Sequence, residues 1–278
     1  MNAKGSVRGS ALLACAPLWS ALMGYAAGSG HVQLAAADRA AIDRVGADAL
    51  AAQHVAGLSI TLARNGSIVY AHGFSARERD GTHAVDADTI FPIGSLTKQF
   101  TAAAVELLAL DGKLSIDAPL AAYVPHAPHA REVTLRELLQ QTSGLANYTA
   151  QPTFSAVAAS TTVTPHDLLA LVANEPLGFV PGTRFEYSNT NYVALGAVIE
   201  AVAKKPYADV IRDRIARPLA LRTLTFGPPS DAPNVVRTPW TPQATYAAGA
   251  LYASPADLVR WNEAFSAPNC CRRPSSRP

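Results

Sequence analysis

The stretch Phe91-Pro-Ile-Gly-Ser-Leu-Thr-Lys-Gln-Phe100 runs on as Thr101-Ala-Ala-Ala-Val-Glu-Leu-Leu-Ala-Leu-Asp111 and is followed by Gly112. Ala, Leu, Gln and Glu favour helix, and a glycine just after the last helical turn is typical of a C-terminal cap. The pattern therefore predicts a largely buried helix from about Thr97 to Asp111, with its start near Ser95.

The hydroxyl of Ser95 and the amine of Lys98 should stand one turn apart, because residues three apart share a helical face. Serine is a weak nucleophile until a base takes its proton, and lysine can be that base only when it is neutral. Burial and the positive end of the helix dipole both lower the pKa of a lysine at a helix start. The pair is a candidate nucleophile and base. A capping serine beside a surface lysine is the alternative, since Ser-x-x-Lys alone is a weak pattern.

Residues 1–37 have the composition of a secretory signal peptide. Lys4 and Arg8 precede the apolar run Ala11–Met23, and small residues follow it. Pro17 interrupts the run, which is short for a bilayer-spanning helix. We expect an exported protein, periplasmic or secreted, with no stable membrane span after cleavage.

The rest of the chain divides into one large domain over residues 38–267 and a tail over residues 268–278 that reads as disordered or aberrant. The formal net charge of the 278 residues is +2, with no cluster of basic residues, which argues against nucleic-acid binding. Cys270 and Cys271 are the only cysteines beyond the signal peptide, and the histidines lack ligand spacing. No disulfide framework, metal or cofactor is expected.

Strands come early in the chain and helices later. An Ala-rich helix is predicted over Asp38–His54, followed by two strands that turn at Asn65-Gly66, which is a strong hairpin signal. Further helices are predicted over Leu135–Gln140, Pro165–Ala173, Asn191–Ala203 and Pro206–Ile215. This order indicates an α+β fold.

A loop Tyr187-Ser-Asn189 leads into the helix expected from Asn191. Polar side chains on such a loop can reach a cleft. The alternative is structural: Asn189 or Thr190 would cap the helix, and Tyr187 would be a half-buried core residue.

Together, Ser95-Leu-Thr-Lys98 and Tyr187-Ser-Asn189 resemble the Ser-x-x-Lys and Tyr-x-Asn motifs of the serine hydrolases that include class C β-lactamases, D-alanyl-D-alanine carboxypeptidases and related esterases. Flanking stretches occur in that family's order: Gly112-Lys-Leu-Ser-Ile-Asp-Ala-Pro119, Thr142-Ser-Gly-Leu145, Pro181-Gly182, and Ala248-Gly-Ala-Leu-Tyr-Ala-Ser-Pro-Ala-Asp257 followed by Trp261. The resemblance implies a β-lactamase/transpeptidase-like fold, with an antiparallel sheet flanked by helices and a mainly helical lobe.

The resemblance also implies roles for individual residues. Ser95 would attack a carbonyl and form an acyl-enzyme, Lys98 and Tyr187 would share the proton transfers, and Asn189 would hold the substrate amide. The substrate would be a small molecule or a peptide, and we expect a monomer. We also expect Ser95 to face Tyr187 across a cleft between the helical lobe and a small sheet.

Two departures from the family pattern stand out. Gln141 occupies the place where many members have His before Thr-Ser-Gly, and only a local change in hydrogen bonding is expected. The third motif, a Lys- or His-x-Gly on a late strand, does not occur after Trp261, so late strands of the sheet are missing. That strand would supply the second oxyanion N–H besides that of Ser95, and losing one such donor costs about a hundred- to a thousandfold in rate.

Two hypotheses follow. The chain is a serine hydrolase acting on amide, ester or β-lactam carbonyls, with activity reduced by the missing motif. Alternatively, it is a non-catalytic exported module derived from that family, which binds peptidoglycan fragments or a partner. The intact set of Ser95, Lys98, Tyr187 and Asn189 favours the enzyme, because a binding module has no need of a nucleophile beside a perturbed base.

Overall fold

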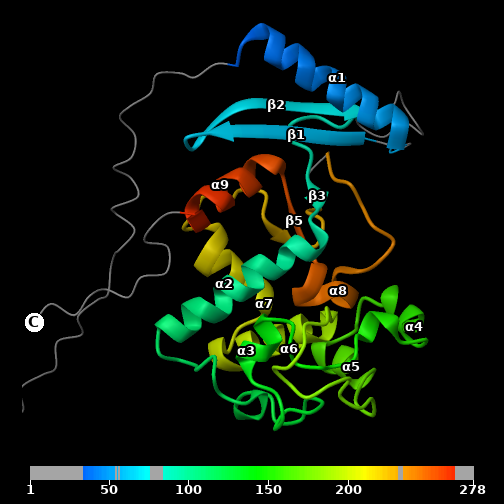
Figure 1. Cartoon of the computed structure of the whole chain (residues 1–278), viewed down its shortest axis with the longest axis vertical. Coiled ribbons are helices and arrows are strands. Elements are labelled where there is room, and N and C mark those ends of the chain that lie inside the picture. The colour runs from blue at the N-terminus through cyan, green and yellow to red at the C-terminus, as the bar shows by residue number, and fades with distance from the viewer. Residues whose placement is uncertain (1–33, 54, 56, 76–83, 231–233, 267–278) are drawn as a thin grey trace, which may run out of the picture.

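The computed structural model describes residues 34–53, 55, 57–75, 84–230 and 234–266. The expected signal peptide lies almost wholly outside these ranges, and the expected tail lies wholly outside them. What is described forms a small hairpin layer at one end and a helical lobe at the other (Figure 1).

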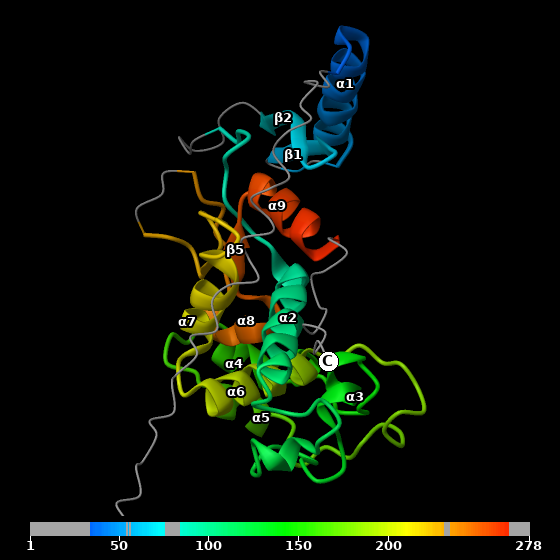
Figure 2. The same cartoon turned by 90° about the vertical axis from the view of Figure 1, so that its left-hand side faces the viewer.

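The hairpin layer consists of α1 (Ala36–Gln53), β1 (Gly57–Arg64) and β2 (Ser67–Ser75). The two strands pair antiparallel, and the turn between them is left-handed at both central residues, with φ 52° at Asn65 and 76° at Gly66. Helix α1 lies on one face of the hairpin and α9 (Pro255–Ser266) on the other, as both views show (Figures 1 and 2). A lone hairpin is marginally stable in water, so these two helices supply the cover it needs.

A second, three-stranded sheet lies between the hairpin and the lobe. Its order is β3 (Phe91–Pro92), β5 (Leu251–Ala253) and β4 (Thr225–Phe226), with both pairs antiparallel. Pro92 pairs with Tyr252, which joins the segment just before Ser95 to a segment more than half the chain away in sequence. This pairing sets where the α2 helix begins.

The lobe is built around two buried helices, α2 (Thr97–Leu110) and α6 (Asn189–Ala203). Leu195, Val198 and Ile199 of α6 have no exposed surface. Around these two helices pack α3 (Leu135–Leu139), α4 (Phe154–Ala158), α5 (Pro165–Ala170), α7 (Tyr207–Ile211), the π-helical turn Arg212–Ala216, α8 (Pro242–Gly249) and the 3₁₀ turns Leu120–Ala122 and Tyr148–Ala150. The lobe therefore holds most of the hydrophobic core.

Local sequence explains several of these helix starts. Thr134 and Glu137 form a reciprocal capping box at α3, and Thr164 and Asp167 form another at α5. Each box satisfies backbone N–H groups that a helix start leaves without partners. At the end of α2, Gly112 has φ 72°, as expected of a C-terminal glycine cap.

The α+β prediction is confirmed, and so are the hairpin and the buried helix after Ser95. Helix α6 begins at Asn189, two residues earlier than predicted. In place of the helix expected over Pro206–Ile215, the structure has α7 followed by a π-helical turn. Helices α4, α8 and α9 were not predicted. Within the described ranges, α9 is the last element.

Candidate active site

Ser95 lies in a 3₁₀ turn, Gly94–Leu96, that leads directly into α2. The chain enters this turn from β3, where the N–H of Ile93 donates to the carbonyl of Leu251 at 2.9 Å. Gly94 has φ 50°, and a Cβ there would meet no atom within 4 Å. Glycine is thus favoured here by the backbone conformation rather than by crowding. The turn leaves the Ser95 side chain exposed while Lys98, one turn on, is buried.

The amine of Lys98 has three polar neighbours. Its Nζ lies 3.2 Å from Oγ of Ser95, 2.9 Å from Oδ1 of Asn189 and 2.8 Å from the carbonyl oxygen of Ala248. Two of these neighbours, the amide and the carbonyl oxygens, can only accept hydrogen bonds. A neutral amine has two N–H groups, and donating both to these oxygens would turn its lone pair toward Ser95. The geometry therefore suits Lys98 as the acceptor of the Ser95 proton.

Burial lowers the pKa of Lys98, and the nearby Tyr187 phenol opposes that shift. Burial disfavours the charged form because the ammonium loses its hydration. The Nζ atom also lies 4.8 Å from the ring centroid of Tyr187 and 5.5 Å from that of Tyr192. The lowered pKa raises the fraction of neutral lysine at any given pH, which is the form that can take a proton.

The first turns of α2 hold in place the segment that carries the Ala248 carbonyl. Thr97 Oγ1 accepts the N–H of Leu251 at 3.1 Å, and Thr101 Oγ1 donates to the carbonyl of Ala247 at 2.7 Å. Within α8 the backbone departs from helix at Tyr246, with φ 38° and ψ −136°. Such a conformation in a residue with a side chain costs about 1–3 kcal/mol and is typical of functional sites.

Tyr187 lies beside Ser95, with 2.7 Å between the phenol oxygen and Oγ. Its side chain is 44% exposed, so the alternative interpretation of Tyr187 as a core residue is wrong. The residue that precedes α6 as its N-cap is Ser188, and it makes no capping hydrogen bond with its side chain. The alternative interpretation of Asn189 or Thr190 as the cap is therefore also wrong.

Gln141 holds the loop on both sides of Tyr187. Its backbone carbonyl accepts the N–H of Glu186 at 2.9 Å, and its Oε1 accepts the N–H of Ser188 at 2.9 Å and the Nδ2 of Asn191 at 2.5 Å. The sequence predicted only a local change at this position, which understates its role. Gln141 holds in place the loop of the candidate site.

Asn147 and Thr149 hold the backbone and the side chain of Asn189, respectively, and the sequence did not predict either of them. Oδ1 of Asn147 accepts the backbone N–H of Asn189 at 3.1 Å, and Asn189 Nδ2 donates to Thr149 Oγ1 at 3.1 Å. These bonds turn Oδ1 of Asn189 toward Lys98. One Nδ2 hydrogen remains to reach a substrate. The only signal in the sequence was their closeness to Thr142-Ser-Gly-Leu145.

A cavity of about 260 Å³ opens beside Ser95. It is lined by residues of β3, the 3₁₀ turn that holds Ser95, the Tyr148–Ala150 turn, the start of α6, the segment before α8, α8 and β5: Pro92, Gly94, Ser95, Tyr148, Thr149, Asn189, Thr238, Trp240, Pro242, Thr245, Ala248, Gly249, Ala250 and Tyr252. The four residues predicted from the sequence therefore meet at one place, and two of them, Ser95 and Asn189, border this cavity.

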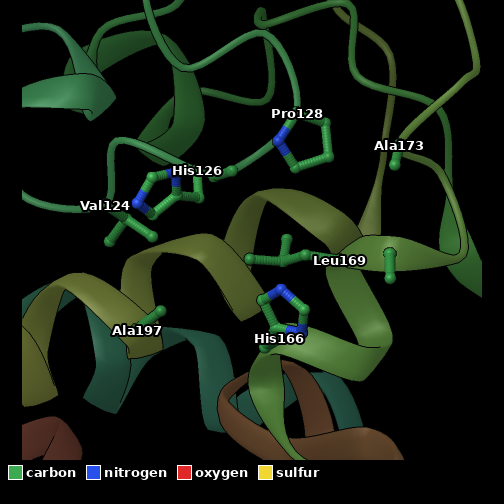
Figure 3. A pocket seen from close by; sticks show the side chains of 9 residues that line it. Val124, His126, Pro128, His166, Leu169, Ala173 and Ala197 are labelled. Carbon is green, nitrogen blue, oxygen red and sulfur yellow. The ribbon is translucent and has the colours of Figure 1, made fainter.

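A second hollow, of about 150 Å³, lies between the α5 and α6 helices and the loop around Pro128 (Figure 3). His126 and His166 border it among mostly apolar side chains, and it shares no lining residue with the cavity beside Ser95. His129 lies outside it and pairs with Glu132 at 2.7 Å. No serine, lysine or carboxylate lines this hollow, so we assign no reaction to it.

Two further findings concern the described residues alone. None of their helices has the length and the apolar composition that crossing a bilayer requires. Among the same residues, no three His, Cys, Asp or Glu side chains gather closely enough to hold a metal ion.

Comparison with known proteins places the chain in a family. The family model described as Beta-lactamase matches residues 42–269, and the chain belongs to that family. "Protein flp" of Staphylococcus aureus (strain MW2) is 31% identical over 183 residues, which cover 62% of this chain and 35% of that protein. This chain thus spans about a third of that relative's length.

Solved structures agree with this placement. The octameric penicillin-binding protein homologue from Pyrococcus abyssi superposes with a TM-score of 0.72 at 29% identity, over 82% of this chain and 56% of that one. The D-stereospecific amidohydrolase from Streptomyces sp. superposes with a TM-score of 0.68 at 27% identity, over 86% and 77% of the two chains. The fold is therefore β-lactamase/transpeptidase-like, and the family is one of serine hydrolases.

Proposed function

We propose that this chain is a serine acyl hydrolase in which Ser95 attacks the carbonyl carbon of an amide, ester or β-lactam. The observation that supports this most directly is the placement of Oγ of Ser95 at 3.2 Å from the Lys98 amine and 2.7 Å from the Tyr187 phenol. A nucleophile within hydrogen-bonding reach of a base is the general arrangement of covalent catalysis.

The proton transfers follow from that geometry. As Oγ of Ser95 bonds to the carbonyl carbon, its proton passes to the lone pair of Lys98 and the carbonyl oxygen becomes an oxyanion. Collapse of this intermediate breaks the bond to the leaving group, which takes a proton from Tyr187. Lys98 then returns its proton to Tyr187, and the acyl group remains bound to Ser95 as an ester. Water then attacks that ester, releases the acid and restores the hydroxyl.

We further propose that attack by Ser95 is retained better than turnover. Activation of the hydroxyl depends on the start of α2 and on Lys98, and both are in place. Stabilisation of the oxyanion needs donors aimed at it, and within the described residues we assign the N–H of Ser95 alone to that role. A site that lacks a second such donor reacts more slowly by about 10²–10³. The acyl-enzyme should therefore form slowly and persist.

Descent from an enzyme explains the site better than a role in ligand binding alone. Lys98 is buried with a lowered pKa and makes three polar contacts, one of them to the nucleophile. Burying an amine in this way is costly, and a site that only binds a ligand gains nothing from it. Neighbours titled D-stereospecific amidohydrolase and D-amino acid amidase act on amides by their names, which fits an acyl-transfer reaction here. Residues 1–37 support export to the periplasm or the medium as part of the same proposal.

The test is intact mass spectrometry of the folded, monomeric fraction after exposure to a reactive fluorophosphonate. We expect slow stoichiometric labelling that Ser95→Ala abolishes and that Lys98→Met slows strongly. Ser67→Ala, at an exposed position in the hairpin, is the matched control and should label like the parent. Labelling of Ser95→Ala at the parent rate would identify another nucleophile, and a folded parent that never labels would reject the proposal.

A further inference from the structure

Among the described residues, no charged side chain lines the cavity beside Ser95. Its lining residues are Pro, Gly, Ala, Ser, Thr, Asn, Tyr and Trp, with no Asp, Glu, Lys, Arg or His among them. We infer that this cavity binds the acyl part of the substrate, and that the acyl groups it accepts are short and carry no positive charge. The inference rests on the proposed acyl transfer and specifies its substrate class.

The position of the proton donor decides which part of a substrate enters the cavity. A leaving group must depart next to the residue that protonates it, which is Tyr187 in the proposed reaction. Tyr187 and Lys98 do not line the cavity, whereas Ser95 does. A carbonyl held at Ser95 therefore directs its leaving group toward Tyr187 and its acyl group into the cavity.

Three hydroxyl groups of the lining already donate hydrogen bonds within the protein. Tyr148 donates to the carbonyl of Ala244 at 2.7 Å, Thr238 donates to the carbonyl of Trp240 at 3.0 Å, and Thr149 Oγ1 donates to Asn147 at 3.0 Å. Burial raises the pKa of Tyr148, so that its phenol carries no charge near neutral pH. An ammonium that entered would lose hydration without gaining an opposite charge from the described lining residues, which is unfavourable.

The size of the cavity limits the acyl group further. Its volume of about 260 Å³ lies below the range of roughly 300–1,000 Å³ that is usual for drug-sized ligands. Trp240 lines the cavity and is 51% exposed. A short aliphatic chain fits these limits, with its apolar surface against Trp240 and Tyr252.

A matched pair of esters tests the inference. In 4-nitrophenyl butanoate and 4-nitrophenyl β-alaninate the acyl groups have the same length, and a methyl in one replaces an ammonium in the other. The rate of acyl-Ser95 formation is followed by intact mass, together with release of nitrophenolate. Each rate is divided by the spontaneous hydrolysis rate of that ester, because the ammonium makes the ester intrinsically more reactive.

We expect the butanoyl ester to acylate Ser95 at least about tenfold faster, since the ammonium has no partner in the cavity. Thr238→Asp adds a carboxylate at an exposed part of the lining and should narrow or reverse that preference. Thr238→Asn, of similar shape but uncharged, should keep the parent's preference.

The outcomes separate the two proposals. If a fluorophosphonate labels Ser95 but the β-alanyl ester reacts as fast as the butanoyl ester, the inference about the acyl group is overturned and the proposed reaction stands. The inference is overturned in the same way if Thr238→Asp leaves the ratio of the two rates unchanged. If the folded protein is labelled by neither the esters nor the fluorophosphonate, the proposed reaction itself fails.

Discussion

Oε1 of Gln141 accepts the backbone N–H of Ser188 at 2.9 Å, one residue beyond the phenol that contacts Ser95. The backbone carbonyl of the same Gln141 accepts the N–H of Glu186, one residue before that phenol. Tyr187 is thus clamped on both sides by a single residue that has no contact with Ser95 among those described. The place of Tyr187 in the site depends on the turn after α3 as much as on its own loop.

Gln141→Met tests this dependence. Methionine keeps the approximate length of the side chain but removes the oxygen that accepts from Ser188 and Asn191. Each of the two donors left unpaired in the interior costs about 1–3 kcal/mol, so we expect a loss of about 2–6 kcal/mol in the free energy of unfolding. Labelling of Ser95 should slow as well, because Tyr187 is no longer held. Urea unfolding and fluorophosphonate labelling give the two readouts.

The matched control for that variant is Gln140→Met, at an exposed neighbouring position. It should change the free energy of unfolding by less than about 0.5 kcal/mol, as is usual for surface substitutions. If Gln141→Met were as stable as this control, the clamp on Tyr187 would have no energetic importance.

Thr149→Val tests how Asn189 is oriented. Valine has nearly the shape of threonine but offers no oxygen to Nδ2 of Asn189, so the amide can rotate and present its NH₂ group to Lys98. We expect labelling of Ser95 to slow by about tenfold, the order of one net hydrogen bond of roughly 1.4 kcal/mol. Thr149→Ser restores the acceptor and should restore the rate. Equal slowing in both variants would point to lost packing instead of lost orientation.

The sequence predicted those parts of the molecule that depend on local patterns. The Asn65-Gly66 turn and the helix that ends before Gly112 were recoverable because each is set by residues adjacent in sequence. Helix α8 was missed because its backbone breaks at Tyr246 and because it is held by a hydrogen bond from Thr101, which is more than a hundred residues away, to the carbonyl of Ala247.

The candidate site was predicted from family motifs, and residues outside the motifs were missed. Asn147 and Thr149 act through Asn189, and nothing in their immediate sequence shows that their side chains turn toward it. The role of Gln141 was underestimated for the same reason: its partners lie about fifty residues later in the chain. Contacts between distant segments are what local patterns cannot supply.

The lowered pKa of Lys98 predicts how labelling depends on pH. Only the neutral amine can take the proton of Ser95, so the labelling rate should rise with pH and level off below the ordinary lysine value of 10.5. Lys98→Met should label near background at every pH. Measuring the rate across the pH range in which the protein stays folded checks this, after correction for hydrolysis of the reagent. A rate that climbs without levelling off up to that ordinary value would mean that Lys98 is not the base.

The same shift predicts the pH dependence of stability. A lysine whose pKa is lower in the folded than in the unfolded state binds fewer protons when folded, so the unfolded state takes up more. The contribution of Lys98 to stability should therefore rise with pH between its lowered pKa and 10.5. Below its lowered pKa, the full loss of stability from burying the Lys98 amine should apply. Lys98→Met removes this dependence. When the free energies of unfolding of the two proteins are measured against pH, the parent should gain stability relative to Lys98→Met as pH rises.

Tyr187→Phe separates the two proton transfers of the proposed reaction. Phenylalanine keeps the ring that lies 4.8 Å from the Lys98 amine but removes the hydroxyl 2.7 Å from Ser95. A nitrophenolate leaves without needing a proton, whereas the leaving group of an anilide or alkyl ester needs one. General acid catalysis contributes about 10²–10⁴ in rate, so the rate of acylation by a butanoyl anilide or alkyl ester should fall by about that factor. The rate of acylation by 4-nitrophenyl butanoate should fall by less than about tenfold. Acyl-Ser95 formation measured by intact mass gives both rates, with Tyr123→Phe as a control at a tyrosine outside the site. Equal losses for the two kinds of leaving group would show that Tyr187 orients Ser95 or Lys98 and does not protonate the leaving group.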